Sequence, residues 1–229
     1  MLRAIVFDFD GVIANSEPLH FRAYREVLAG VAITLTERDY YDRYLGFDDV
    51  AAFEQIARDY GVALTTGQLR ELVERKAARL EDLEAGVSVL FAGAADAIRR
   101  AAAAVPIGIA SGARGEEIRR VLVREQLATS FTAIVAAEDT PISKPAPDPY
   151  LLVLTRLRIA TGRSIAAREC VAVEDSRWGL QSARAAGMRT VAVTHTYDKS
   201  ELEDAADLVI QSLPAMDLDA LAALCPESN

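Results

Sequence analysis

Short apolar runs rich in β-branched residues recur along this chain and alternate with longer segments of helical pattern. Runs of this kind are typical of strands that are buried on both faces of a parallel sheet. The runs cover residues 4–7, 106–110, 133–135, 171–173, 190–193 and 208–210. The segments 115–127 and 177–186 between them carry helical periodicity, and Gly187 ends the second. The alternation predicts an α/β fold with a doubly wound, mostly parallel sheet.

A helical block interrupts the alternation after the first strand. Between residues 18 and 85 we find amphipathic helical stretches and no convincing strand. The clearest stretch is 68–83, whose stripe consists of Leu69, Leu72, Val73, Lys76, Leu80 and Leu83. We therefore predict an α/β core of residues 1–14 and 86–229 and a helical cap domain of residues 15–85. The hinges are expected near residues 13–15 and 86–88.

Composition excludes several classes of function. The chain has 34 acidic and 25 basic residues, so it lacks the positive charge of a nucleic-acid-binding protein. No segment approaches the roughly 18 consecutive apolar residues that a membrane-spanning helix needs. Two cysteines are too few for a disulfide framework, and two histidines cannot build a histidine-rich metal site. We expect a cytoplasmic protein that binds neither nucleic acid nor membrane.

Asp8 and Asp10 follow the first predicted strand directly. Their spacing of two directs both side chains to one side of the strand, and ligands of open α/β sheets bind at the carboxyl ends of the strands. An ordinary Asp-Gly turn is the alternative interpretation. As a functional pair, one carboxylate would attack or bind a metal while the other moves protons.

Three further strand ends carry polar residues, and two of them are considered first. Ser111, Gly112 and Arg114 lie where another strand meets a helix, and a hydroxyl followed by free amides suits a phosphate, although Ser111 could equally be a plain helix cap. Glu174 and Asp175 end a fourth strand, where either a cap or a metal ligand is possible.

Lys144 stands in the proline-rich segment 143–148. Only three of the 25 basic residues are lysines, at positions 76, 144 and 199, so a lysine in a rigid loop indicates that a compact ammonium is needed there. Carboxylates, a hydroxyl and an ammonium at four strand ends together suit magnesium and a phosphate.

These motifs resemble those of the haloacid dehalogenase (HAD) superfamily of phosphotransferases. The segment 8–12, Ser111, Lys144 and the pair Glu174–Asp175 appear in the family's order, and the helical block lies where the family places a small α-helical cap. The segments 16–23 and 143–150 are similar to the branch of β-phosphoglucomutase and its sugar-phosphate phosphatase relatives. The resemblance implies a Rossmann-like core with an inserted cap.

The resemblance also implies roles for individual residues. Asp8 would attack phosphorus and become an aspartyl phosphate, and Asp10 would protonate the leaving group and later activate water. Mg²⁺ would bind Asp8, Asp175 and the backbone carbonyl of Asp10, with Glu174 nearby. Lys144 and Ser111 would hold the phosphoryl oxygens. Gly112, Arg114, His20 and Lys76 are the further candidates for substrate binding.

Three functions remain to be distinguished. A phosphatase passes the phosphoryl group to water, whereas a mutase of the β-phosphoglucomutase type returns it to a sugar. A receiver-like phosphoacceptor is disfavoured, because such domains resemble a single unit without a cap. A mutase needs cations in the cap for a second phosphate, but the comparable stretch 44–49 is apolar and acidic. The sequence therefore favours a phosphatase for a small phosphorylated metabolite, with sugar phosphates as the expected class. His195 lies past the fifth predicted strand, where it could approach the site or simply cap the strand, and it receives no role.

Overall fold

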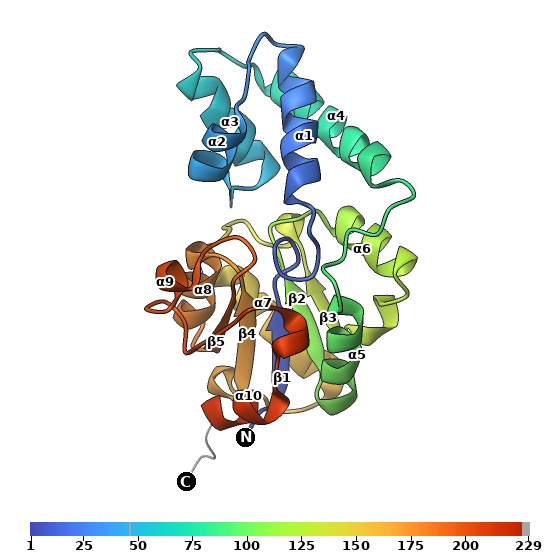
Figure 1. The fold of residues 1–229 in the computed structure, drawn as a ribbon, viewed down its shortest axis with the longest axis vertical. Coiled ribbons are helices and arrows are strands. Elements are labelled where there is room, and N and C mark those ends of the chain that lie inside the picture. Colours follow the sequence, from blue (N-terminus) through green and yellow to red (C-terminus); the bar gives the residue numbers. More distant parts are fainter. Residues whose placement is uncertain (46, 226–229) are drawn as a thin grey trace. The chain divides into compact units, whose positions relative to one another are not determined.

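The computed structural model describes residues 1–45 and 47–225, so Gly46 in the stretch 44–49 lies outside the described residues. The chain divides into two compact units, drawn in Figure 1: a core of Met1–Asn15 with Leu90–Asn229, and a cap of Ser16–Val89. Our boundary at residues 85 and 86 precedes the observed one. An antiparallel bridge between Ala14 and Leu90 explains the difference, because pairing with the core begins only at Leu90.

Six parallel strands form the sheet of the core, in the order β3-β2-β1-β4-β5-β6. Every predicted run is a strand, and the fold class is confirmed. The strands are β1 Ala4–Phe7, β2 Ile107–Ala110, β3 Ala133–Val135, β4 Cys170–Glu174, β5 Arg189–Val193 and β6 Leu208–Ile210. The chain moves to one side of β1 for β2 and β3 and to the other side for β4 onward. This reversal puts the ligand-binding crevice of such a sheet at the carboxyl ends of β1 and its neighbours.

The core also contains helices, most of which lie between successive strands in the chain. They are α5 Ala94–Ala104, α6 Gly115–Arg124, α7 Asp148–Thr161, α8 Arg177–Ala185, α9 Lys199–Leu202 and α10 Leu218–Leu224. Short 3₁₀ turns lie at η2 Ala128–Ser130, η3 Ala137–Asp139, η4 Ala167–Glu169 and η5 Leu213–Ala215. The helix predicted over 115–127 ends at Arg124, because Gln126 adopts a positive φ of 56° that a helix cannot continue.

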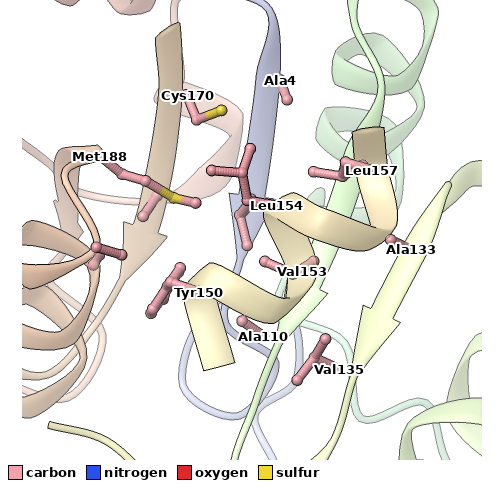
Figure 2. Close-up of a cluster of buried hydrophobic side chains, with 14 of the residues drawn as sticks. Ala4, Ala110, Ala133, Val135, Tyr150, Val153, Leu154, Leu157, Cys170 and Met188 are labelled. Atoms are coloured by element: carbon pink, nitrogen blue, oxygen red, sulfur yellow. The ribbon is translucent and has the colours of Figure 1, made fainter. Parts of the chain in front are cut away.

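Helix α7 packs its apolar face onto the sheet (Figure 2). Tyr150, Val153, Leu154 and Leu157 of this helix meet strand residues that are mostly small, among them Ala4, Ala110, Ala133 and Cys170. Alternate residues of a strand point to opposite faces, so Ala4 and Val6 contact this cluster while Ile5 and Phe7 are buried on the other face. Burial of both faces accounts for the unbroken apolar character of the strands.

All regular secondary structure in the described residues of the cap is helical. Its elements are α1 Glu17–Ala29, α2 Glu37–Asp39, the π-helical turn η1 Tyr40–Tyr44, α3 Asp49–Asp59 and α4 Thr66–Glu84. Within the predicted stripe of α4, Leu72, Lys76 and Leu80 are buried at a spacing of four residues. Leu72 packs in a core rich in aromatic residues, such as Tyr24 and Phe53, and Nζ of Lys76 lies 5.0 Å from the centroid of the Tyr24 ring. None of the described helices has the length and apolar character needed to cross a membrane.

Candidate active site

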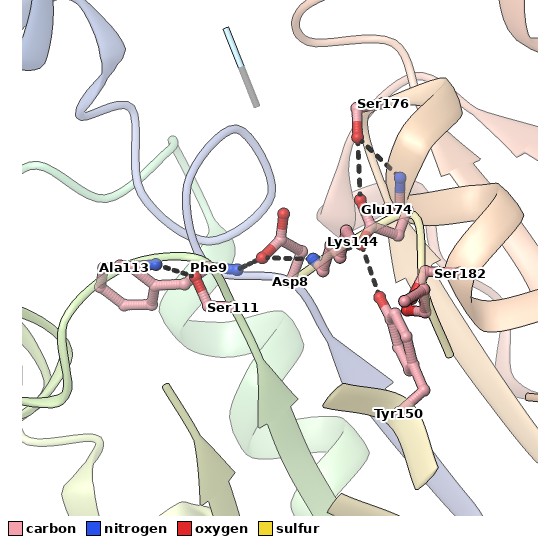
Figure 3. Close-up of polar contacts among 11 residues, drawn as sticks. Asp8, Phe9, Ser111, Ala113, Lys144, Tyr150, Glu174, Ser176 and Ser182 are labelled. Atoms are coloured by element: carbon pink, nitrogen blue, oxygen red, sulfur yellow. Dashed lines mark hydrogen bonds and ion pairs between the residues drawn. The ribbon is translucent and has the colours of Figure 1, made fainter. Parts of the chain in front are cut away.

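Residues from several strand ends meet at the carboxyl edge of the sheet (Figure 3). Asp8 follows β1, Ser111 follows β2, and Glu174 is the last residue of β4. Lys144 comes from the loop before α7. These elements are parallel neighbours, so their ends lie at one edge, as the sequence motifs required.

Asp8 is held by its backbone and by one carboxylate oxygen. Its N–H donates to the carbonyl of Val173 at 2.9 Å, which extends the pairing of β1 with β4 past the last residue of β1. Oδ1 accepts from the Phe9 N–H at 2.7 Å and lies 3.0 Å from Nζ of Lys144. In Figure 3 the second oxygen points away from Lys144 and Phe9. The carboxylate is therefore oriented with one oxygen anchored and the other directed elsewhere.

Lys144 bridges two carboxylates. Its ammonium lies 2.5 Å from Oε1 of Glu174 in addition to the contact with Asp8, and its side chain is 11 % exposed. Tyr150 of α7 donates its hydroxyl to the same Oε1 at 2.6 Å. Ser182 of α8 donates to the carbonyl of Ala146 at 2.5 Å and so fastens the lysine loop to the core. The position of the ammonium is thus set by two helices as well as by its charge partners.

The electrostatics of this group are dominated by burial. Burial and then repulsion from Asp8 raise the pKa of Glu174 to about 7, against the attraction of Lys144. Burial alone would lower the pKa of Lys144, but the charges of Asp8 and Glu174 outweigh it and raise that pKa above its ordinary value. Lys144 is therefore a permanent cation between carboxylates that repel each other.

The buried carboxylates fit a magnesium ion. Asp8, Glu174 and Asp175 each offer an oxygen, and these oxygens lie within 4.8 Å of one another. A cluster of oxygen ligands with excess negative charge suits a hard divalent cation. Glu174 is fully buried and already accepts from Lys144 and Tyr150, so Asp8 and Asp175 are the better candidates for direct ligands.

Asp10 occupies the tight loop after β1. The loop is closed by the N–H groups of Ile13 and Ala14, which both donate to the carbonyl of Phe9, and Asp10 pairs with Ala14 in a parallel bridge. Among the described residues, the clustered carboxylates do not include the side chain of Asp10. The loop thus places Asp10 directly after the strand, two residues beyond Asp8.

Ser111 is buried, and its hydroxyl oxygen accepts from the N–H of Ala113 at 3.0 Å (Figure 3). The carboxylate of Glu138 accepts from the N–H of Gly115 at 3.1 Å. The N–H of Arg114 donates to the carboxylate of Glu117 at 3.4 Å. The expectation of free amides at this helix start is therefore wrong for three of them, because nearby side chains already accept from them. Gly112 borders open space, since a Cβ added there would meet nothing within 4 Å. Arg114 is the N-cap residue of helix α6.

A model of the haloacid dehalogenase-like hydrolases matches residues 5–193. The chain belongs to this family. It is 29 % identical over 230 residues to Protein CbbY of Rhodobacter capsulatus, covering 97 % of this chain and 99 % of that protein. It is 31 % identical over 192 residues to hexitol phosphatase B of Escherichia coli K12, covering 83 % and 82 %.

A solved structure of β-phosphoglucomutase from Clostridium difficile superposes with a TM-score of 0.86 at 20 % identity, over 98 % of this chain and 97 % of that one. At this identity the likeness shows the fold alone. Membership of the family and the fold, with its helical cap, are both as the sequence motifs indicated.

Within the cap of this HAD-like hydrolase, the two remaining candidates contact each other. Nζ of Lys76 lies 2.9 Å from Nδ1 of His20 and 2.7 Å from Oδ1 of Asp49. Tyr24 donates its hydroxyl to the same oxygen of Asp49 at 2.6 Å. Lys76 is fully buried. The cap therefore contains a buried ion pair between its single lysine and Asp49.

Sequence reasoning assigned no role to three residues that contact the site of this family member. Tyr150 lies at the end of the segment 143–150, which we used only for the resemblance. His195 bonds the carbonyl of Gly11, and Thr196 bonds Asp175. Nothing in the pattern of either position signals a partner, because each contact joins residues far apart in the chain.

Proposed function

We propose that this chain is a magnesium-dependent phosphatase that hydrolyses the phosphate monoester of a small metabolite through an aspartyl phosphate at Asp8. The observation that carries the proposal is the buried group of Asp8, Lys144 and Glu174, in which a carboxylate at a strand end is held against an ammonium. Family membership supports the reaction class.

In the first step, an oxygen of Asp8 attacks phosphorus while the bond from phosphorus to the ester oxygen breaks. Asp10 gives its proton to the departing oxygen, so the product leaves as a neutral alcohol. Lys144 and the hydroxyl of Ser111 would hold the phosphoryl oxygens, where negative charge is carried in the transition state. Gly112 and Arg114 would contribute a backbone N–H and a guanidinium to the same group.

In the second step, water attacks the phosphorus of the aspartyl phosphate. Asp10, now a carboxylate, takes a proton from that water, and the bond between phosphorus and the Asp8 oxygen breaks to release phosphate and restore both residues. Magnesium held by Asp8, Asp175 and the carbonyl of Asp10 would supply positive charge that offsets the repulsion between carboxylate and phosphate. Glu174 would keep Lys144 in place.

The substrate we propose carries a single phosphate, as in a sugar or hexitol phosphate. A mutase must hold a second phosphate with cations, but Lys76 of the cap already pairs with Asp49. A second phosphate at Lys76 would compete with this carboxylate and be repelled by it. Hexitol phosphatase B, at 31 % identity, supports the choice of hydrolase.

The test is phosphate release from a panel of small phosphate esters, with and without Mg²⁺, by the wild-type chain and by Asp8→Asn. We expect release that requires the metal, and a loss of at least about 1,000-fold in the variant, since the nucleophile is gone. Full activity of Asp8→Asn, or release that is indifferent to chelation, would contradict the proposal.

The mutase alternative has its own assay. β-Glucose 1-phosphate is supplied with a catalytic amount of glucose 1,6-bisphosphate, and glucose 6-phosphate is measured alongside free phosphate. We expect free phosphate to dominate. Rapid formation of glucose 6-phosphate without phosphate release would replace the hydrolase by a mutase.

A further inference from the structure

The loop after β5 bonds both of the acidic loops of the core. Nδ1 of His195 lies 2.9 Å from the carbonyl oxygen of Gly11, directly after Asp10. The next residue, Thr196, donates its hydroxyl to Oδ2 of Asp175 at 2.5 Å. We propose that His195 and Thr196 are positioning residues, which hold the Asp10–Gly11 turn and the Asp175 carboxylate in the geometry that metal binding and proton transfer require. The inference rests on the proposed function.

His195 is itself held from two sides. Its ring stacks on Phe91, with 3.8 Å between the centroids and 21° between the planes. The backbone N–H of Phe91 donates to the carbonyl of Ile13 at 3.1 Å, in the same loop that contains Asp10. Because a carbonyl oxygen only accepts, Nδ1 must carry the proton. His195 and Phe91 thus hold the loop of Asp10 by hydrogen bonds to the carbonyls of Gly11 and Ile13, respectively.

Thr196 acts at the second loop. Asp175 is buried, and its Oδ2 lies directly against Gly11, where an added Cβ would stand 2.0 Å from this oxygen. A carboxylate that must present an oxygen to a metal needs its rotation fixed, and a hydroxyl donor to the other oxygen does this. The backbone of the β5 loop is anchored in turn, since the N–H of Thr194 donates to the carbonyl of Ile210 at 3.1 Å.

The hydrogen bonds of His195 and Thr196 act together, because these two residues are adjacent in one loop. The loops after β1 and β4 both carry proposed metal ligands, and they come from strands that pair directly. Bonds from a third loop to both of them fix their separation as well as their individual conformations. Loss of either bond is expected to loosen the site while leaving the charges of Asp8, Asp10 and Asp175 unchanged.

The first experiment measures metal binding without catalysis. The rise in the thermal unfolding temperature with Mg²⁺ concentration is compared for wild type, Thr196→Val and Thr196→Ser. Valine keeps the shape of threonine and removes the donor, whereas serine keeps the donor. We expect Thr196→Val to need at least about 10-fold more Mg²⁺ than wild type for the same rise in unfolding temperature. Thr196→Ser should need about the same Mg²⁺ concentration as wild type. Equal Mg²⁺ dependence in all three proteins would overturn the role of Thr196.

The second experiment separates the ring of His195 from its hydrogen bond. His195→Phe keeps a ring to stack on Phe91 and loses the donor; His195→Asn loses the ring and keeps a nitrogen donor as many bonds from Cβ as Nδ1. We expect kcat to fall between about 10-fold and 100-fold in His195→Phe with little change in KM, and to recover in His195→Asn. The reverse order would mean that stacking alone matters, and would remove His195 from the proposal.

Failure of this inference is distinguishable from failure of the proposed function. Mg²⁺ stabilisation of the wild-type chain that Thr196→Val loses supports the positioning role even if no ester in the panel is hydrolysed. Hydrolysis that depends on Asp8, combined with a Thr196→Val protein that binds Mg²⁺ normally, keeps the phosphatase and discards the positioning role.

Discussion

Lys144 and Glu174 form a buried ion pair, with 2.5 Å between Nζ and Oε1, although 30 residues separate them in the chain. The same ammonium lies 3.0 Å from Asp8, so one cation serves two carboxylates. Its compactness matters, because the lysine side chain is only 11 % exposed and a planar guanidinium fork is larger than an ammonium.

Replacement of Lys144 by arginine tests this requirement. We expect Lys144→Arg to lower kcat for phosphate release by at least about 100-fold, because a planar guanidinium cannot take the place of the ammonium between Asp8 and Glu174. Lys199→Arg, on the short helix α9, is the control and should leave the rate unchanged. A Lys144→Arg protein with wild-type turnover would show that positive charge alone is sufficient.

Removal of the Tyr150 hydroxyl tests its support of Glu174. Tyr150→Phe deletes the donor that lies 2.6 Å from Oε1 in a fully buried environment. We expect the free energy of unfolding in urea to fall by about 1–3 kcal/mol, because Glu174 loses a hydrogen bond that no water can replace. Tyr41→Phe, in the cap, should change it by less than about 0.5 kcal/mol. Similar losses in the two variants would contradict this interpretation.

Asp49 should make the stability of the cap depend on pH. Burial would raise the pKa of this carboxyl, but Lys76 and then His20 outweigh that effect and hold the pKa below its ordinary value of 3.8. A lowered folded pKa contributes stability that is present above 3.8 and is lost as the pH falls through the folded pKa.

Asp49→Asn measures that contribution. At neutral pH the variant is expected to lose about 3–5 kcal/mol of unfolding free energy, since it removes the carboxylate partner of the buried Lys76. The difference in unfolding free energy between wild type and variant should become smaller in acid, once the pH falls below the pKa of Asp49 in the folded protein. Unfolding in urea at neutral and acidic pH, with exposed Asp42→Asn as control, checks both. A gap that is the same at the two pH values would rule out the ion pair as its cause.

Gly11 offers a test of how closely the two acidic loops approach. Its φ is +74°, and a Cβ there would stand 2.0 Å from Oδ2 of Asp175. Gly162 has a similar φ of +64° with nothing within 4 Å of an added Cβ, so it isolates the backbone strain. We expect Gly162→Ala to cost about 1 kcal/mol and keep Mg²⁺ stabilisation.

Gly11→Ala should cost more than this control and abolish the rise in unfolding temperature with Mg²⁺, because Asp175 must move. If the two alanine variants respond to Mg²⁺ alike, the close approach has no part in metal binding.

The lysines illustrate how far composition can be taken. Rarity of lysine drew attention to Lys144 and, equally, to Lys76, and both ammonium groups are found in buried pairs with carboxylates. The sequence pointed to the importance of a compact cation, but the partners Glu174 and Asp49 were not foreseeable. Each partner lies on a different element, and its distance from the lysine is decided by how those elements pack.

At the start of α6, an expectation from the sequence is contradicted by the structure. From sequence, Ser111 and the residues after it were expected to offer free amides to a phosphate. The structure instead bonds the N–H of Ala113 to Ser111 and that of Gly115 to Glu138. Glu138 belongs to the turn after β3, which becomes a neighbour of α6 only when β2 and β3 pair.

By itself, the sequence determined the alternation of strands and helices, the helical insertion and the four strand-end motifs, because these depend on the local period and type of residues. Only the tertiary structure decided which donor meets which acceptor. In the chain, His195 lies 184 residues from Gly11 and Thr196 lies 21 residues from Asp175, and such contacts follow from the order of strands in the sheet. Hydrogen bonds between distant residues leave no periodic trace in a sequence, since their geometry exists only after the strands have paired.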